Sequence, residues 1–112
     1  MSQPPFNGVA PRISANDIDK YRGRYVTMVT EASEYGTPLV TKDVITSKDV
    51  VIHSITDEGQ LARINEFFLF VESTSGDLIY HSNGTMPDDF DAKSYAELVR
   101  MSNNGYGHLF GL

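Results

Sequence analysis

The sequence predicts a small all-β protein in which five short strands form a barrel and one α-helix follows them. Five segments rich in β-branched and aromatic residues occur between residues 24 and 82. Turn-forming residues separate these segments at short intervals. A segment with helical periodicity, residues 91–103, comes after them. Five strands in 112 residues favour an OB-type barrel over an immunoglobulin-like sandwich, which needs about seven strands.

A short N-terminal helical turn is expected ahead of the strands, over residues 17–21. Ser14 or Asn16 is suited to cap it, because a short side chain with an oxygen atom accepts hydrogen bonds from free backbone N–H groups. Gly23 is suited to end it, since glycine adopts the left-handed conformation that often follows a helix. This turn is predicted to close one end of the barrel.

The strands are expected at residues 24–32, 39–46, 49–56, 66–73 and 78–82. In the first strand, Val26 and Met28 are predicted to share one face. The fourth, "EFFLFVES", is apolar on both faces, so it is expected to be central and covered on both sides. The segment "NGTMPDD" is expected to leave the sheet, with "NGT" as a turn.

These elements divide the chain into four parts. Residues 1–10 are expected to be a flexible lead-in, because they carry two prolines and a glycine and show little pattern. The OB-type barrel is expected over 11–90, an assembly helix over 91–103 and a tail over 104–112.

The composition excludes several classes of protein. The chain has no cysteine, which rules out a disulfide scaffold and thiolate metal sites. No apolar run approaches the roughly 20 residues of a membrane span, and no signal peptide is evident, so we expect a soluble intracellular protein. The net charge is −6, with nine basic residues scattered among fifteen acidic ones, which argues against strong independent binding to nucleic acid.

The C-terminal helix, "FDAKSYAELVRM", has an unusually wide apolar surface. Asp91 is suited to cap its N-terminus. At 100° per residue, Leu98 and Met101 lie about 60° and 120° to one side of Tyr95, while Ala96 lies about 100° to the other side. The apolar arc therefore spans roughly 220°, against the stripe of about 100° that is typical of a helix packed on one core.

Two interpretations of this helix remain open. In one, the helix only plugs its own barrel. In the other, it packs on its barrel with one side and on partner helices with another. The second interpretation predicts a subunit interface formed by Ala92, Tyr95, Ala96, Leu98, Val99 and Met101.

The sequence carries no motif for catalysis, metal binding or cofactor binding, so we expect no enzyme, no metal site and no cofactor. His53 and His81 lie on separate expected strands, without carboxylates at metal-ligand spacing. The acidic run "DDFD" precedes a helix, where negative charge is favourable. The sequence shows no glycine-rich phosphate loop and no nucleophile elbow.

Exposed aromatic residues of an OB barrel are candidate stacking positions for single-stranded nucleic acid. Phe67, Phe68 and Phe70 lie so close together in one strand that a core position is expected for them. Three tyrosines are freer, namely Tyr25, Tyr35 and Tyr80. Without a basic groove around them, a stacking role is the less favoured interpretation.

The order of these features resembles the smallest subunit of replication protein A. "APRISANDIDKYRGRYVTMVTEA" resembles the opening of that family, "INEFFLFVES" its fourth strand, and "FDAKSYAELVRM" its closing helix. The resemblance covers residues 11–32 and 64–102.

The resemblance implies an OB-fold protein that assembles with a middle and a large subunit through a bundle of three C-terminal helices. It implies a nuclear complex that binds single-stranded DNA in replication, repair and recombination, mainly through the partner subunits. Carried over to this chain, it assigns Tyr95, Leu98, Val99 and Met101 to the bundle helix. It assigns Pro11, Arg12 and Ile13 to an N-terminal closure of the barrel.

Three alternatives stay open from the sequence. The complex could serve telomeres or telomerase, where related small OB subunits occur. The chain could be an autonomous OB module that binds nucleic acid or a peptide. It could also be a small interaction domain unrelated to DNA, with a dimerising helix.

Overall fold

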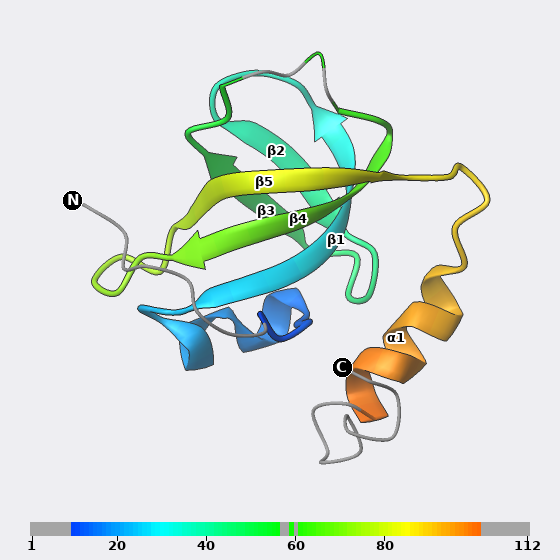
Figure 1. The fold of residues 1–112 in the computed structure, drawn as a ribbon, viewed down its shortest axis with the longest axis horizontal. Coiled ribbons are helices and arrows are strands. Elements are labelled where there is room, and N and C mark those ends of the chain that lie inside the picture. The colour runs from blue at the N-terminus through cyan, green and yellow to red at the C-terminus, as the bar shows by residue number, and fades with distance from the viewer. Residues whose placement is uncertain (1–9, 57–58, 60, 102–112) are drawn as a thin grey trace.

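The computed structural model describes residues 10–56, 59 and 61–101, and it shows a closed five-stranded barrel with a helix beside it (Figure 1). The strand order around the barrel is β1-β2-β3-β5-β4, and β4 pairs with β1 to close it. All neighbours are antiparallel except β3 and β5. The strands are β1 (Tyr25–Glu34), β2 (Leu39–Asp43), β3 (Asp49–His53), β4 (Ile64–Val71) and β5 (Leu78–Met86).

This architecture confirms the OB-like barrel expected from the sequence, with a short N-terminal helical turn and a C-terminal helix. The turn is a 3-10 helix, η1 (Ala15–Tyr21), and the C-terminal helix is α1 (Ala92–Met101). No helix in the described part of the chain is long and apolar enough to cross a membrane. The expected tail, 104–112, and all of the expected lead-in except Ala10 lie outside the described residues.

The barrel interior is filled by the inward residues that strand alternation predicts. Val26 and Met28 of β1 are fully buried, as are Phe67 and Leu69 of β4. Residues from every strand and from the segment before η1 complete this cluster: Ile13, Leu39, Val50, Ile52, Val71 and Leu78. The strand β4 lies between β1 and β5, as every strand of a closed barrel lies between two others. Most of its residues are buried, but Phe68 is partly exposed, so the expected cover on both faces is incomplete.

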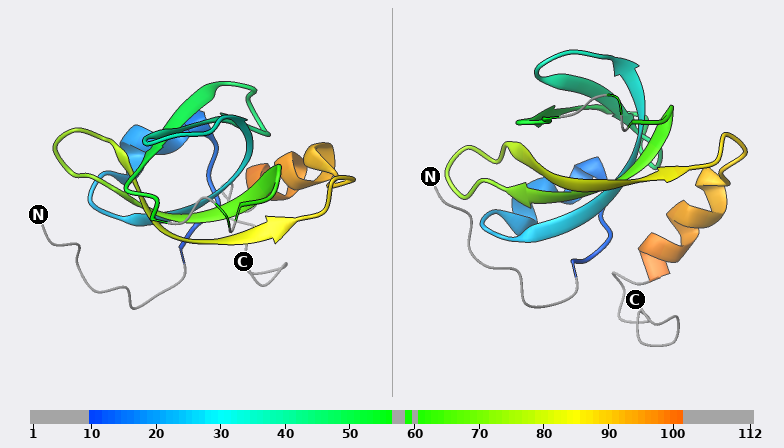
Figure 2. Two further views of the ribbon diagram at one scale, coloured as in Figure 1. Left: turned by 90° about the horizontal axis from the view of Figure 1, so that it is seen from above. Right: turned by 45° about the horizontal axis from the view of Figure 1, so that its top comes forward.

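The segment ahead of η1 joins the sheet. Arg12 forms a parallel bridge with Thr27 of β1. The backbone N–H of Thr27 donates to the carbonyl oxygen of Pro11 (2.9 Å), and the N–H of Ile13 donates to the carbonyl oxygen of Thr27 (3.0 Å). These residues therefore extend the sheet along β1 before η1 lies across one end of the barrel (Figure 2).

The expected cap position of η1 is confirmed, but the expected capping hydrogen bond is absent. Ser14 occupies the N-cap position, but its side chain makes no capping hydrogen bond. The N–H of Ala15 instead donates to Oδ2 of Asp43, at 2.8 Å, from the end of β2. A residue 28 positions away thus does what a local side chain was expected to do. The expected end at Gly23 is consistent with its positive φ of 79°.

The buried carboxylate of Asp43 also organises the connection between β2 and β3. It accepts hydrogen bonds from the N–H groups of Ile45 and Thr46 and from the hydroxyl of Thr46 (3.3, 3.3 and 2.8 Å). Asp43 is 0% exposed, so these bonds replace its lost hydration. The expected strand 39–46 ends at Asp43 for this reason.

The segment "NGT" is strand and not the turn that the sequence suggested. Residues 83–85 belong to β5 and pair with β4. The side chain of Asn83 accepts from the hydroxyl of Tyr80 (2.7 Å) and donates to Oδ1 of Asn65 (3.3 Å). Asn65 is fully buried and also holds both backbone polar groups of Ala62. This network fixes the strand where local propensity favours a turn.

We expect Asp43→Ala to lower the free energy of unfolding by about 3 kcal/mol or more, because it leaves four partly buried donors without an acceptor. The matched control is Asp49→Ala, which removes an exposed carboxylate whose nearest cation, Lys42, is 4.0 Å away. The control should change stability by less than about 0.5 kcal/mol. Urea denaturation of both variants measures the difference, and equal losses would contradict the role given to Asp43.

Candidate subunit interface

The helix α1 is held beside the barrel by the linker that precedes it. Arg63, just before β4, pairs with Glu31 of β1 and with Asp88 of the linker (Nε to Oδ1, 3.3 Å). Its guanidinium also donates to the carbonyl oxygen of Asp88 at 3.0 Å. The linker therefore leaves β5 in a defined direction.

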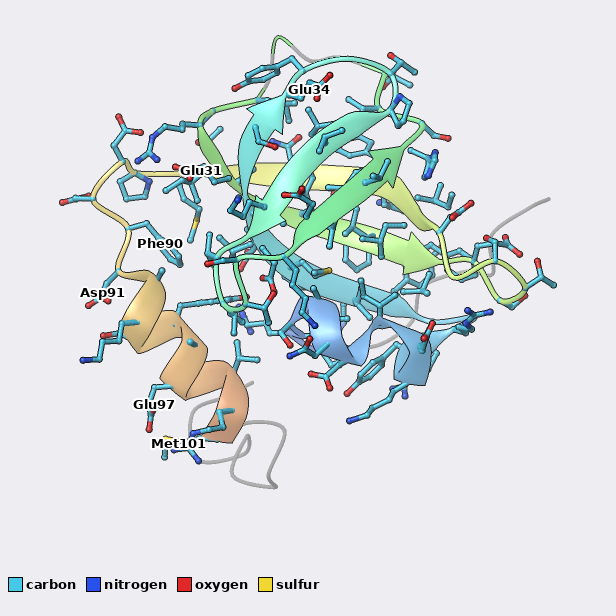
Figure 3. All side chains as sticks on the ribbon, turned by 180° about the vertical axis from the view of Figure 1, so that it is seen from behind. Glu31, Glu34, Phe90, Asp91, Glu97 and Met101 are labelled. Carbon is cyan, nitrogen blue, oxygen red and sulfur yellow. The ribbon has the colours of Figure 1, made fainter. Side chains whose placement is uncertain are left out.

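Asp91 caps α1, as its position in the sequence predicted. Its carboxylate accepts hydrogen bonds from the backbone N–H of Ser94 (3.0 Å) and from the hydroxyl of Ser94 (2.8 Å). These bonds hold the pKa of the Asp91 carboxyl below its ordinary value, because they favour the charged form. Figure 3 shows Asp91 at the start of the helix, next to Phe90.

A second apolar cluster, outside the barrel interior, attaches α1 to the barrel. Tyr95 and Val99 are 8% and 3% exposed and pack with Val29 and Ile64. The partly buried members of the cluster are Val44, Ile45, Met86 and Phe90. The Phe90 and Tyr95 rings are tilted with centroids 5.5 Å apart. Only one side of the helix is used in this attachment.

The hydroxyl of Tyr95 is buried and has no hydrogen-bond partner among the described residues. Burial raises the pKa of Tyr95, and the negative charge of Glu66 raises it further, because both disfavour the phenolate. The residue therefore acts as a neutral apolar anchor. The unpaired hydroxyl oxygen lowers the stability of the fold, and the packing of the ring offsets this loss.

The other four residues of the predicted interface are partly exposed. They are Ala92, Ala96, Leu98 and Met101. Leu98 and Met101 lie on one side of the buried strip, and Ala96 lies on the other. Figure 3 shows Met101 and Glu97 pointing away from the barrel. The structure thus divides the six predicted residues into two anchors, Tyr95 and Val99, and four that are accessible in this chain.

A cavity of about 460 Å³ lies on the Ala96 side of the helix, between α1, η1 and the β2–β3 connection. Its apolar lining comes from Ile45, Ala96 and Val99. Two ion pairs also line it. Lys20 and Asp17 of η1 form one, at 3.1 Å, and Arg100 and Glu97 of α1 form the other, at 2.6 Å. This side of the helix therefore has an apolar hollow flanked by charges that are already paired.

The residues that sequence reasoning missed here are Val44 and Ile45. They were expected to continue a strand, but they leave the sheet after Asp43 and pack against α1. The available signal was Asp43 itself, an acidic residue within an apolar strand pattern. Such a residue is suited to accept hydrogen bonds from a turn that follows it.

A group of aromatic rings lies on the outer face of β1, β4 and β5. Tyr25 stacks on Phe68 with centroids 5.2 Å apart and an interplanar angle of 10°. His81 stands edge-on to Phe68 at 4.8 Å. Phe67 is fully buried and Phe70 is 4% exposed, as expected for core residues, whereas Phe68 is partly exposed. Of the freer tyrosines, Tyr35 is 55% exposed.

The basic side chains offer little free positive charge to phosphates. Six of the nine form ion pairs with carboxylates, namely Arg12, Lys20, Arg22, Lys42, Arg63 and Arg100. Within the part of the chain that the structure describes, no group of three His, Asp or Glu residues is arranged to hold a metal ion. His53 ends β3 and His81 lies in β5.

The chain is similar in fold to several solved structures, of which two are described here. One is replication protein A from U. maydis bound to single-stranded DNA, with a TM-score of 0.76, 18% identity and 98% coverage of each chain. The other is the telomere capping protein Ten1 from Saccharomyces pombe, with a TM-score of 0.68 and 13% identity, covering 86% of this chain and 99% of that one. No protein-family model and no curated protein matches the sequence. At these identities the likeness shows a shared OB-like fold.

We expect Tyr95→Phe to leave the free energy of unfolding unchanged at pH 7, or to raise it by about 1 kcal/mol, since the lost hydroxyl has no partner. The raised pKa of Tyr95 means that the unfolded chain ionises first, above about pH 10. The native protein should therefore lose stability relative to Tyr95→Phe as the pH rises above that value. Urea denaturation at pH 7 and pH 10.5 measures both differences. A gap that stays constant between the two pH values would show that this hydroxyl is solvated.

Proposed function

We propose that this chain is the structural small subunit of a nuclear complex that resembles replication protein A and binds single-stranded DNA in replication, repair and recombination. The fold shared with replication protein A supports the class of complex. The observation that carries the proposal is that the barrel covers only part of the apolar surface of α1. The barrel occupies one strip of the helix, and apolar positions remain on both sides of that strip.

The position of these remaining residues matches what a helix bundle requires. A helix in a three-helix bundle contacts two neighbours, one on each side of the axis that points to the bundle centre. Leu98 and Met101 extend to about 120° on one side of Tyr95, and Ala96 lies about 100° away on the other side. A methyl side chain at Ala96 allows a partner helix to approach closely. The two sides of α1 that the barrel leaves uncovered therefore accommodate two partner helices.

This arrangement narrows the interface to Ala92, Ala96, Leu98 and Met101. Tyr95 and Val99 serve it indirectly, because they fix the rotation of α1 on the barrel. Their burial in the chain's own cluster makes them unsuitable as probes of association. A charged residue at Val99 would detach the helix from the barrel as well as from a partner.

Contact with DNA is assigned to the partner subunits. The net charge is −6, and most basic side chains are already paired with carboxylates of the same chain. Phosphate contacts supply much of the affinity of proteins for single strands, and they need cationic side chains that are not neutralised. The proposed role of this subunit is therefore to complete and stabilise the assembly.

The second candidate is a small subunit of a telomere-capping complex. It is favoured by the fold that the chain shares with Ten1 over nearly all of that protein's length. The two candidates use the same helix surface and differ in their partners. Pull-down from nuclear extract with mass spectrometry separates them by the OB-fold subunits that are recovered.

We expect Leu98→Glu combined with Met101→Glu to weaken association with partner subunits by about 100-fold or more, because two charges would enter a desolvated contact. The measurement is co-purification after co-expression with candidate OB-fold partners. Circular dichroism of the isolated variant confirms that the barrel is folded.

The control for this variant is Lys93→Glu, on the polar strip of α1. It changes the net charge by −2, as the double substitution does, but on a face that the proposal leaves in solvent. It should leave co-purification unchanged. Equal loss of partners in both variants would show that charge, and not this apolar flank, governs association.

We also expect the isolated chain to bind single-stranded oligonucleotides weakly, with a dissociation constant above about 10⁻⁴ M at physiological salt. Fluorescence anisotropy with a labelled oligonucleotide measures this value. Tight binding by the isolated monomer, lost as salt is added, would reject the structural-subunit role and favour an autonomous OB module.

A further inference from the structure

The helices η1 and α1 are held on the barrel by different apolar clusters. Ile18 and Tyr21 of η1 pack against the cluster that fills the barrel interior. Tyr95 and Val99 of α1 belong to the second cluster, around Val29, outside that interior. Because neither cluster includes residues of both helices, a space remains between them, and the cavity of about 460 Å³ occupies this space. The cavity is therefore a consequence of how the two helices are anchored.

The lining of this cavity suits an uncharged apolar group. On the η1 side, Lys20 and Asp17 form an ion pair at 3.1 Å, and on the α1 side Arg100 and Glu97 form another at 2.6 Å. Each side therefore carries one acid and one base, which leaves no excess of either charge. A phosphate would find no unpaired cation among these four side chains. The surface between the two ion pairs is apolar and comes from Ile45, Ala96 and Val99.

A second cavity, of about 190 Å³, meets the same flank of α1 at Ala92. Ala92 lies one helical turn before Ala96, about 6 Å along the axis. The β2–β3 connection lines both cavities, through Val44 and Ser47 in the smaller one and through Ile45 in the larger one. The two cavities therefore follow each other along α1, at the spacing of side chains that are four residues apart on a helix.

The two flanks of α1 have opposite shapes. On one flank, Leu98 and Met101 are large apolar side chains that are partly exposed. On the other flank, Ala92 and Ala96 are small and border the two cavities. When helices pack, a large side chain of one helix enters a hole in the surface of its neighbour. One flank therefore supplies large side chains and the other receives one, so the partners of the two flanks are not interchangeable.

We propose that the Ala96 flank receives one partner helix, which lies along α1 and inserts a leucine, methionine or phenylalanine side chain into the larger cavity. One turn away, the same helix presents a short polar side chain to the smaller cavity. This partner then contacts η1 and the β2–β3 connection as well as α1, whereas a bundle of C-terminal helices needs α1 alone. The inference rests on the proposed assembly function and adds the chemistry of the partner that this flank selects.

The first test is Ala96→Phe, which fills the larger cavity from within the chain. Pairwise co-expression with each candidate OB-fold partner should show one partner bound about tenfold more weakly or worse, and the other unchanged. The melting temperature of the isolated variant should stay constant or rise, because the ring enters an existing cavity. The matched control is Lys93→Phe, which places the same ring on the polar strip of α1 and should leave both partners bound. Binding of both partners by Ala96→Phe at the strength of the original chain would overturn the proposal.

Photo-crosslinking tests the position of the partner without filling the cavity. In the assembled complex, p-benzoylphenylalanine in place of Lys20, which lines the cavity from η1, should crosslink to the partner that Ala96→Phe rejects. The same group in place of Asp19, whose side chain is 83% exposed, should not crosslink to it.

The two proposals fail in different ways. An assembled complex without a crosslink from position 20 would overturn docking beside Ala96 and leave the assembly role of α1 standing. Association that survives Leu98→Glu combined with Met101→Glu, as well as Ala96→Phe, would reject the assembly role and this inference together.

Discussion

The arrangement of this protein depends on one buried carboxylate, that of Asp43. Burial of a carboxylate costs several kcal/mol unless hydrogen bonds replace its hydration, and here donors from Ala15, Ile45 and Thr46 supply them. Because those donors belong to η1 and to the β2–β3 connection, the two segments are fixed to each other at one end of the barrel. The same connection presents Val44 and Ile45 to α1. The placement of this one carboxylate therefore contributes to the position of the helix, through Val44 and Ile45.

The barrel has two separate apolar clusters, and this separation explains the helix. The interior cluster is complete without α1, since strands and the N-terminal segment fill it. The helix attaches to a smaller cluster around Val29 and Ile64, outside that interior. A small cluster covers only a narrow strip of a helix. The partly exposed Leu98 and Met101 are a direct result, and they form part of the proposed assembly surface.

The surface combines neutralised basic side chains with a group of aromatic rings on one face of the barrel. Carboxylates neutralise most of the basic side chains, so the surface has little to offer to phosphate groups. The aromatic rings that could stack with bases gather instead on the outer face of β1, β4 and β5. This division agrees with the proposed structural role, in which the partner subunits contact the DNA.

The sequence by itself determined the number and order of the strands, the inward positions of residues such as Val26 and Met28, the closing helix and its Asp91 cap. These features follow from alternation, from helical periodicity and from hydrogen bonds within three residues, which are local. Only the tertiary structure decided what caps η1, because the acceptor on Asp43 lies 28 positions away. It likewise decided which strip of α1 is buried. The periodicity gave a wide apolar arc without a preferred direction, and the direction is set by residues such as Ile45 that chain folding brings from elsewhere.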